Sequence, residues 1–218
     1  SVSQQKQFYY CFKCRSTGNV IGFLEQYSGL NFVESIETLA SLNSIEVPYE
    51  DSPKRAEGRE DIYDALDKAT IFYESYLSNE ASAEKVRKYL NEERKLSGKV
   101  CRHFSIGYAP SSWDALTDHL VQKGIKEEVL INAGLSKRNK KGDLYDIFRD
   151  RLMFPIKDRK GRTVGFGGRV MNPEDQPKYL NTGETLVFQK GKELYGLYES
   201  SLNRRDITKI FVVEGYVD

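Results

Sequence analysis

The sequence predicts an α+β fold: a small zinc-ribbon-type remnant with helices, then a mixed α/β core that leads into an α/β subdomain. Three observations support this prediction. Cys11 and Cys14 form a CxxC pair in an aromatic segment, helical spacing of apolar residues dominates residues 61–133, and apolar strand-like runs begin near Arg151. The chain is long enough to hold one or two domains with ordinary cores.

Charge and cysteine usage narrow the class of protein. The formal net charge is +1, so a nucleic-acid-binding surface would have to be local. Three cysteines, no recognisable signal peptide and no apolar run near about 18 residues exclude a disulfide scaffold and a membrane span. We therefore expect an intracellular, reducing compartment.

The CxxC pair has the spacing of one half of a zinc knuckle, in which two thiolates from a tight turn bind one tetrahedral ion. A closed structural site needs four ligands, but Cys101, His103 and His119 lie far downstream. We expect these three residues to be structural, so Cys11 and Cys14 look like two of the four ligands of a zinc site. A thioredoxin-like redox pair and two buried thiols are the alternatives, although no buried strand that would precede a redox motif is evident.

Helical segments dominate the first two thirds of the chain. Residues 19–42 have apolar residues at helical spacing, interrupted at Ser28 and Gly29, which predicts two short helices. Residues 48–60, rich in charge, proline and glycine, are predicted to form a linker. Helical spacing then returns over residues 61–90. Further helices are predicted from a cap at Ser112 to about residue 122, and over residues 126–133.

Strands are predicted in the last third. RLMFPIKDRKGRTVGFGGRV, residues 151–170, predicts a hairpin with its turn at residues 158–161. Residues 210–213 form an unbroken apolar run, which suits a buried strand of a parallel sheet.

Two carboxylates follow that apolar run, Glu214 directly and Asp218 shortly after. The carboxyl end of a buried strand is where open α/β folds bind ligands, and hard oxygen ligands there suit Mg²⁺. The pattern fits equally well the start of a helix, where the macrodipole favours acidic residues. Spacing alone leaves both interpretations open.

Basic residues gather on the hairpin and on the segment after it. Interleaved with aromatic residues, they suit a single nucleic-acid strand or nucleotide phosphates. Gly165, Gly167 and Gly168 favour this interpretation over a merely solvated charged face, because glycine weakens a strand unless its backbone approaches something closely. The basic residues are Arg151, Lys157, Arg159, Lys160, Arg162, Arg169, Lys178, Lys190 and Lys192, and the aromatic residues are Phe154, Phe166, Tyr179 and Phe188.

In this order, the segments resemble the bacterial DnaG-type primases over almost the whole chain. KQFYYCFKC and GNVIGFLEQYSGLNFVESIETLA resemble the second half of the family's zinc-binding domain, whose first ligand pair, a CxxH, would precede this chain. RDRLMFPIKDRKGRTVGFGGRV, PKYLNTGET and FQKGKELYGLYE resemble the polymerase core, and VVEGYVD resembles the entry to the TOPRIM subdomain. The resemblance implies an internal fragment with part of the zinc-binding domain at 1–47, a linker at 48–60, the N-terminal basic subdomain of the core at 61–209, and the start of the TOPRIM subdomain at 210–218.

The resemblance also implies roles for single residues. Cys11 and Cys14 would bind zinc, and Glu214 would be a ligand of the catalytic metal and a candidate general acid or base. Asp218 would be a further magnesium ligand. Positions for template or nucleotide binding fall on Arg94, Arg151, Arg169, Lys178, Asn181 and Lys190. Where the family commonly has Arg-Gly, this chain has Arg94-Lys95.

The implied activity is that of a primase, a DNA-dependent RNA polymerase that makes short RNA primers on single-stranded DNA from ribonucleoside triphosphates. Zn²⁺ would be structural, and Mg²⁺ or Mn²⁺ would serve nucleotidyl transfer. Replicative DNA helicase and single-strand-binding protein would be partners through regions outside this chain, at the replication fork in the bacterial cytoplasm. The chain alone is expected to be inactive. A non-catalytic single-stranded-DNA-binding module and a fragment of a TOPRIM-type nuclease or topoisomerase are the alternatives, although the latter would lack the hairpin and PKYLN.

Overall fold

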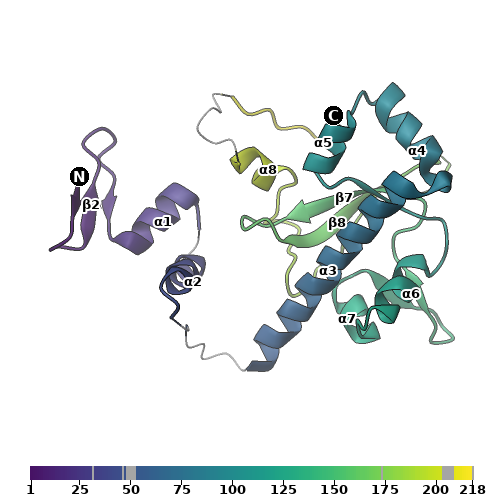
Figure 1. Cartoon of the computed structure of the whole chain (residues 1–218), viewed down its shortest axis with the longest axis horizontal. Helices are drawn as coiled ribbons and strands as arrows, with labels where there is room; N and C mark the ends of the chain where they lie inside the picture. Colours follow the sequence, from purple (N-terminus) through teal and green to yellow (C-terminus); the bar gives the residue numbers. More distant parts are fainter. Residues whose placement is uncertain (31, 46, 48–52, 173, 203–208, 218) are drawn as a thin grey trace. The chain divides into compact units, whose positions relative to one another are not determined.

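The computed structural model describes the chain except for residues 31, 46, 48–52, 173, 203–208 and 218, and for residues 53–57 it describes the backbone only. The chain divides into two units, Ser1–Ser52 and Pro53–Asp218 (Figure 1). Both helices and sheets are present, so the predicted α+β class is confirmed. Within the described residues, no helix is both long and apolar enough to cross a membrane.

The first unit joins a small antiparallel sheet to two helices, as the interrupted helical spacing predicts. The side chain of Asn19 accepts a hydrogen bond from the backbone N–H of Gly22 at 2.9 Å and so caps the first helix. Gly29 ends that helix with a φ of 66°, a left-handed conformation that glycine adopts without strain. The elements are β1 (Val2–Ser3), β2 (Phe8–Tyr10), β3 (Thr17–Gly18), α1 (Val20–Ser28) and α2 (Phe32–Leu42).

The second unit contains a four-stranded sheet in the order β4-β7-β8-β9, in which each neighbouring pair is antiparallel. The predicted hairpin is its centre, β7 and β8, and β5 pairs separately with β6. The elements are α3 (Pro53–Asn79), the 3₁₀ turn η1 (Ala81–Ala83), α4 (Glu84–Lys88), the π-helical turn η2 (Tyr89–Glu93), α5 (Gly98–His103), β4 (Gly107–Ala109), α6 (Ala115–Gln122), α7 (Glu127–Asn132), β5 (Ser136–Arg138), β6 (Leu144–Asp146), β7 (Arg151–Lys157), β8 (Thr163–Val170), β9 (Tyr179–Asn181) and α8 (Leu197–Ser201).

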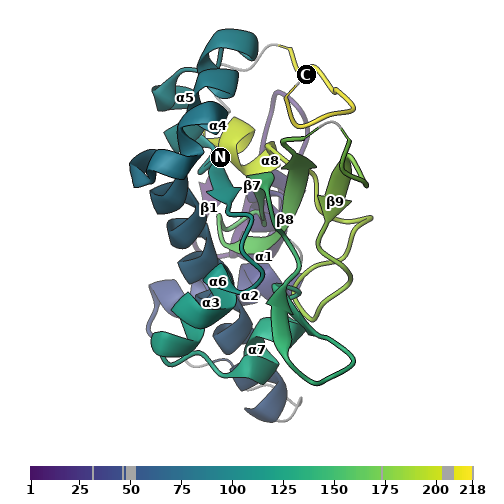
Figure 2. The same cartoon turned by 90° about the vertical axis from the view of Figure 1, so that its right-hand side faces the viewer.

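Helix α3 crosses this sheet and buries one of its faces (Figure 1, Figure 2). Leu66 and Tyr73 of α3 share a core with Met153 of β7. The next residue on β7, Phe154, points to the opposite face because side chains alternate along a strand, and it lies in a second core with Leu90 of η2. Both faces of the central strand are therefore buried.

Helix α3 begins at Pro53, so residues 53–60 of the predicted linker are helical. Lysine, arginine, alanine and glutamate in this stretch favour a helix, and proline is tolerated at the first helical position. The remainder of the predicted linker, residues 48–52, lies outside the described residues. The helix ends at Asn79, so the spacing over residues 61–90 is divided among α3, η1, α4 and the start of η2.

Residues 210–213 do not form the buried parallel strand that their apolar run predicts. Ile210 is 71% exposed and Phe211 is 86% exposed. A buried strand needs hydrogen-bonded neighbours, and the sheets of the described residues are antiparallel and do not pair with this segment. Partial burial begins at Gly215, and the ring of the next residue, Tyr216, stacks on Phe154 with centroids 4.9 Å apart.

Helix α6 is capped by a residue distant in sequence rather than by Ser112. Helix α6 begins at Ala115, and the side chain of its N-cap residue, Asp114, makes no capping hydrogen bond. Instead, the buried carboxylate of Asp146 accepts hydrogen bonds from the backbone N–H groups of Leu116 and Thr117, both at 2.9 Å. The cap therefore also joins α6 to the end of β6.

We predict that Asp146→Ala lowers the free energy of unfolding of the second unit by about 2–4 kcal/mol, because two helix N–H groups lose their buried acceptor. Asp114→Ala is the matched control and should cost less than about 0.5 kcal/mol, since its side chain caps nothing. Urea denaturation of both variants measures the difference. Equal losses would contradict the assignment of Asp146 as the cap.

Candidate nucleic-acid interface

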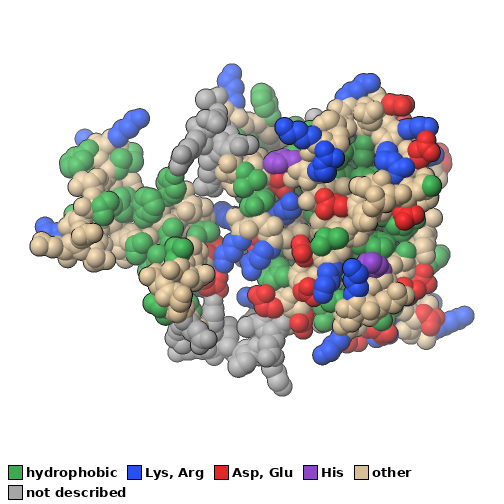
Figure 3. Space-filling view, viewed as in Figure 1, with side chains coloured by type: hydrophobic (Ala, Val, Ile, Leu, Met, Phe, Trp, Pro, Cys, Tyr) green, Lys and Arg blue, Asp and Glu red, His purple; other side chains and the backbone are tan. Residues whose placement is uncertain are grey.

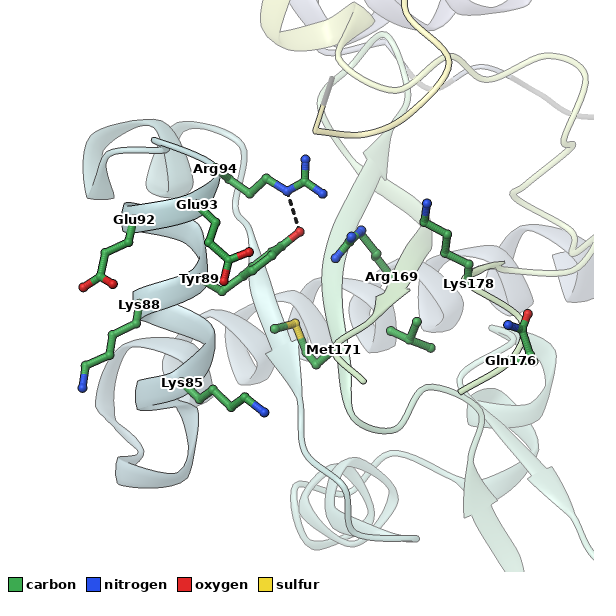
Figure 4. A pocket seen from close by; sticks show the side chains of 11 residues that line it. Lys85, Lys88, Tyr89, Glu92, Glu93, Arg94, Arg169, Met171, Gln176 and Lys178 are labelled. Atoms are coloured by element: carbon green, nitrogen blue, oxygen red, sulfur yellow. Dashed lines mark hydrogen bonds between the residues drawn. The ribbon is translucent and has the colours of Figure 1, made fainter. Parts of the chain in front are cut away.

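A pocket of about 650 Å³ lies between the π-helical turn η2 and the end of β8 in the second unit (Figure 4). It brings together three of the basic residues singled out from the sequence: Arg94, Arg169 and Lys178. Figure 3 shows lysine, arginine and acidic side chains interspersed over the visible face of this unit, so positive charge is not spread broadly there. The pocket is lined by Lys85, Lys88, Tyr89, Glu92, Glu93, Arg94, Arg169, Val170, Met171, Gln176 and Lys178.

The ring of Tyr89 lies at the centre of this arrangement. The guanidinium carbon of Arg94 lies 5.4 Å from the ring centroid, and that of Arg169 lies 5.2 Å from it. Nε of Arg94 also donates a hydrogen bond to the Tyr89 hydroxyl at 2.5 Å. The ring face attracts cations, so one tyrosine orients two guanidinium groups that would otherwise repel each other.

The turn that carries Tyr89 and Arg94 is unusual in its backbone. The N–H of Arg94 donates to the carbonyl of Tyr89 at 3.1 Å, which is the wide hydrogen bond of a π-helical turn. Lys95 then has a φ of 56°, a left-handed conformation that favours glycine. Lysine adopts this conformation here at a cost of about 1–2 kcal/mol.

The side chains of the pocket divide by direction. In Figure 4, Arg169 and Lys178 point into the same space, whereas Lys88 and Glu92 point away from it. Lys88 is already paired with Glu84 at 2.9 Å. Nε of Arg169 is buried without a hydrogen-bond partner in the described structure. The other N–H donors of the Arg169 guanidinium match phosphate oxygens, so the pocket suits a phosphate group.

Arg151 lies outside the pocket. It is 7% exposed, and its Nη1 donates to the carbonyl oxygens of Gly168 at 3.2 Å and Pro177 at 2.9 Å. Burial lowers the pKa of its guanidinium group. These contacts hold β7 and β8 to the segment that leads into β9, so Arg151 supports the strands on which the pocket is built.

Asn181 and Lys190 also lie outside the pocket lining. The side-chain oxygen of Asn181, on β9, accepts a hydrogen bond from the Tyr216 hydroxyl at 2.8 Å. Lys190 has an exposed side chain, and its backbone N–H donates to the carboxylate of Glu184 at 3.0 Å.

The predicted aromatic and glycine-rich face of the hairpin serves internal packing. Phe154, Phe166 and Phe188 are buried in the cores, so the expectation that they interleave with cations on a binding face is wrong. A side chain at Gly167 would lie 2.3 Å from the ring of Tyr216, so this glycine makes room for the protein itself. The sequence interpretation missed Tyr89, because its helical spacing gave no sign of the π-helical turn.

The carboxylate site is only partly described. Glu214 is exposed, and Asp218 lies outside the described residues. Tyr216 fixes the adjacent backbone by packing on Phe154 and bonding to Asn181. Among the described residues, no group of three or more His, Cys, Asp or Glu side chains could hold a metal ion. The carboxylate of Glu214 has the right chemistry for Mg²⁺, but alone it does not make a site.

Cys11 and Cys14 lie on the turn between β2 and β3. The carbonyl of Cys11 accepts from the N–H of Arg15 at 2.8 Å, and the N–H of Cys11 donates to the carbonyl of Ser16 at 2.8 Å. The pKa of the Cys11 thiol is lowered, first by the backbone N–H of Cys14, then by the thiol of Cys14 and the backbone N–H of Lys13. A tight turn with amides directed at a thiolate fits one half of a thiolate zinc site.

The three downstream candidates have packing partners of their own. Cys101 is half-buried against the second core, and burial raises the pKa of its thiol. His119 lies 4.9 Å from the ring of Phe72, centroid to centroid, and burial lowers its pKa. His103 contacts Phe104 edge-on. These contacts agree with the structural roles expected from the sequence.

Family models and curated relatives match the chain along its length. A model described as the DNA primase catalytic core, N-terminal domain, matches residues 72–201, and one described as the CHC2 zinc finger matches residues 1–55. The DNA primase of Pseudomonas putida is 45% identical over 100% of this chain and 34% of the relative. The DNA primase of Escherichia coli is 43% identical over 100% of this chain and 38% of the relative. The chain thus spans about a third of the length of these relatives.

Solved structures of primases share the fold. One described as the DnaG primase catalytic domain bound to ssDNA is 43% identical, with a TM-score of 0.66 over 74% of this chain and 49% of that one. The zinc-binding and RNA polymerase domains of the Aquifex aeolicus primase are 34% identical, with a TM-score of 0.58 over 90% of this chain and 46% of that one. The CHC2 match supports zinc binding by the first unit.

We predict that the 218-residue chain retains zinc poorly during dialysis, because two thiolates satisfy half of a tetrahedral site. Elemental analysis after dialysis should give well below one zinc per chain. Cys11→Ser should abolish what remains, whereas Cys101→Ser should leave it unchanged. Stoichiometric zinc that depends on Cys101 would contradict the half-site.

Proposed function

The chain belongs to the bacterial DnaG-type primase family, and on this premise we propose that it forms the template-binding part of an enzyme that makes RNA primers on single-stranded DNA. The observation that carries the proposal is the pocket in which Tyr89 orients Arg94 and Arg169. The enzyme would be a nucleotidyltransferase that uses ribonucleoside triphosphates.

The pocket has the chemistry of a backbone clamp for a single strand. Its guanidinium groups present planar sets of N–H donors that match phosphate oxygens, and Lys178 adds a point charge beside Arg169 on the β8 side of the pocket. Contacts from these groups to phosphate oxygens carry no information about the bases. The pocket should therefore hold a strand in register without selecting its sequence, as a template site must.

Other residues would act around this clamp. We propose that Asn181 and Lys190 contact nucleotide or template, that Arg151 acts indirectly by holding the strands beneath the pocket, and that Cys11 and Cys14 bind zinc in a unit that contributes to template recognition. Glu214, and Asp218 with it, would be ligands of Mg²⁺ or Mn²⁺, an ion that stabilises charge on the transferred phosphoryl group. The described residues supply only part of that metal site.

The family also bears on organisation and partners. We propose the zinc-binding unit at residues 1–47, a linker at residues 48–60 that includes the start of helix α3, the basic subdomain at residues 61–209, and the entry to TOPRIM at residues 210–218. Replicative helicase and single-strand-binding protein would be partners in the bacterial cytoplasm, outside the surfaces described above.

A non-catalytic single-stranded-DNA-binding module is the second candidate function for the chain alone. One observation favours it: the described residues supply the cationic pocket but no cluster of metal-binding carboxylates. Binding to DNA and ribonucleotide incorporation must therefore be measured separately.

We predict that Arg169→Ala weakens binding of a single-stranded oligonucleotide about tenfold and lowers the log–log salt slope by about 0.7, the value for one lost phosphate contact. Tyr89→Phe should weaken binding about threefold and leave the slope unchanged, because the charges stay but Arg94 loses its hydrogen bond. Fluorescence anisotropy at several salt concentrations measures both quantities.

Lys68→Ala is the matched control, since this lysine lies on α3 and pairs with Asp64 at 2.6 Å. Its affinity should equal that of the wild type at every salt concentration. Unchanged affinity in Arg169→Ala, or the same loss in Lys68→Ala, would show that the pocket does not bind the strand.

For Glu214, we predict that Glu214→Gln in the complete gene product lowers ribonucleotide incorporation about a hundredfold, because the amide cannot supply the charge that a divalent ion requires. Affinity for single-stranded DNA should be unaffected, since the pocket residues remain. Near-normal incorporation by the variant would reject Glu214 as a metal ligand, and joint loss of binding would indicate a damaged fold.

A further inference from the structure

One face of the four-stranded sheet carries both Asn181 and the pocket residue Arg169. Gly167 of β8 is the direct cross-strand partner of Asn181 on β9, and Arg169 lies two residues further along β8. Side chains two apart on a strand share a face, so Asn181 and Arg169 are diagonal neighbours within reach of one ligand. On its other side, Gly167 is the partner of Phe154 on β7. The glycine therefore leaves a gap on this face between Phe154 and Asn181.

The ring of Tyr216 fills this gap. It stacks on the ring of Phe154 with centroids 4.9 Å apart, and a side chain at Gly167 would lie 2.3 Å from it. The ring of Tyr195 meets it edge-on with centroids 5.0 Å apart, and that of Tyr179 lies 5.8 Å away. These contacts hold the ring on several sides, so its hydroxyl has a fixed position beside β9.

The Tyr216 hydroxyl selects one orientation of the Asn181 amide. It donates a hydrogen bond to Oδ1 of Asn181 at 2.8 Å. Because the carbonyl end of the amide faces Tyr216, the Nδ2 end, which carries two N–H donors, faces away from it. Asn181 is exposed on β9, so a ligand can reach these donors. Without the hydroxyl, rotation of the amide would let its acceptor end face the ligand as well.

The neighbours of the amide favour an anionic oxygen as its acceptor. On the same face, Arg169 directs its guanidinium group into the pocket, and Lys178 points into the same space (Figure 4). Two cationic groups beside an amide that presents N–H donors match the oxygens of a phosphate group. A nucleoside triphosphate and a nucleic-acid strand both supply such a group.

We propose that Tyr216 is a positioning residue whose hydroxyl holds the Asn181 amide so that Nδ2 donates to a phosphate oxygen of the ligand bound beside Arg169. The inference rests on the proposed function, in which Asn181 contacts nucleotide or template. Tyr216 acts through Asn181 and does not itself touch the ligand. It follows Glu214 by two residues, so the same contact holds the backbone beside the proposed metal ligand.

A double-mutant cycle tests whether Tyr216 acts through Asn181. The 218-residue chain is titrated calorimetrically with ATP and, separately, with a short oligothymidylate, both in EDTA so that no divalent ion contributes. Tyr216→Phe keeps the ring and removes only the hydroxyl, so it should weaken binding about threefold. Asn181→Ala should weaken binding about fivefold, and the double variant should bind as Asn181→Ala does.

Tyr76→Phe is the matched control, because the Tyr76 hydroxyl forms a hydrogen bond with that of Ser82 at 3.1 Å and neither residue lines the pocket. It should change neither affinity. The ligand whose affinity falls in Tyr216→Phe supplies the phosphate, and a fall for both assigns the donor to both.

Unchanged affinity for both ligands in Tyr216→Phe would overturn the inference. Losses that add in the double variant would also overturn it, because Tyr216 would then act independently of Asn181. If Arg169→Ala weakens binding while Tyr216→Phe does not, the pocket stands and the positioning role is rejected. If the wild-type chain binds neither ligand, the proposed function and the inference both fail.

Discussion

The second unit depends on how closely α3 approaches the sheet. A side chain at Gly107 of β4 would lie 2.5 Å from the backbone of Tyr73 in α3, so only glycine permits this contact. The approach lets α3 bury one face of β7, while Leu90 of η2 packs on the other face with Phe154. After α3 the chain continues through η1 and α4 and packs on the sheet again at η2. The pocket forms where η2 meets the end of β8.

The pocket gathers positive charge in a small space, which is unfavourable without compensation. Tyr89 offsets part of this repulsion, because its ring attracts the guanidinium groups of both Arg94 and Arg169. Its hydroxyl also accepts a hydrogen bond from Arg94. Compensation remains incomplete, since Nε of Arg169 is buried without a partner in the described structure. The negative charge of a phosphate would offset the remaining repulsion, so the pocket suits an anionic strand.

The parts of the fold that were predictable from sequence have strong local signals. The break at Gly29 and the turn that joins the apolar strands β7 and β8 are local signals, and both predictions are confirmed. The cap of α6 comes from Asp146, a residue of β6, and no local pattern identifies a tertiary contact of this kind. The apolar run at residues 210–213 was misinterpreted, because a strand depends on its neighbours as much as on its own residues. For the site, the basic composition predicted Arg169 and Lys178, and both line the pocket. It also predicted Arg151, which is buried outside the pocket. It missed Tyr89, which lines the pocket from the π-helical turn.

Amide hydrogen exchange of the chain with and without a single-stranded oligonucleotide tests most directly whether η2 and the end of β8 bind the strand. Ordering of the side chains on these elements should slow local opening, so amides of residues 89–94 and 169–171 should exchange more slowly in the complex. The amides of α3 around Lys68 should be unchanged and serve as the internal reference. Binding with no added protection at residues 89–94 and 169–171 would contradict the account.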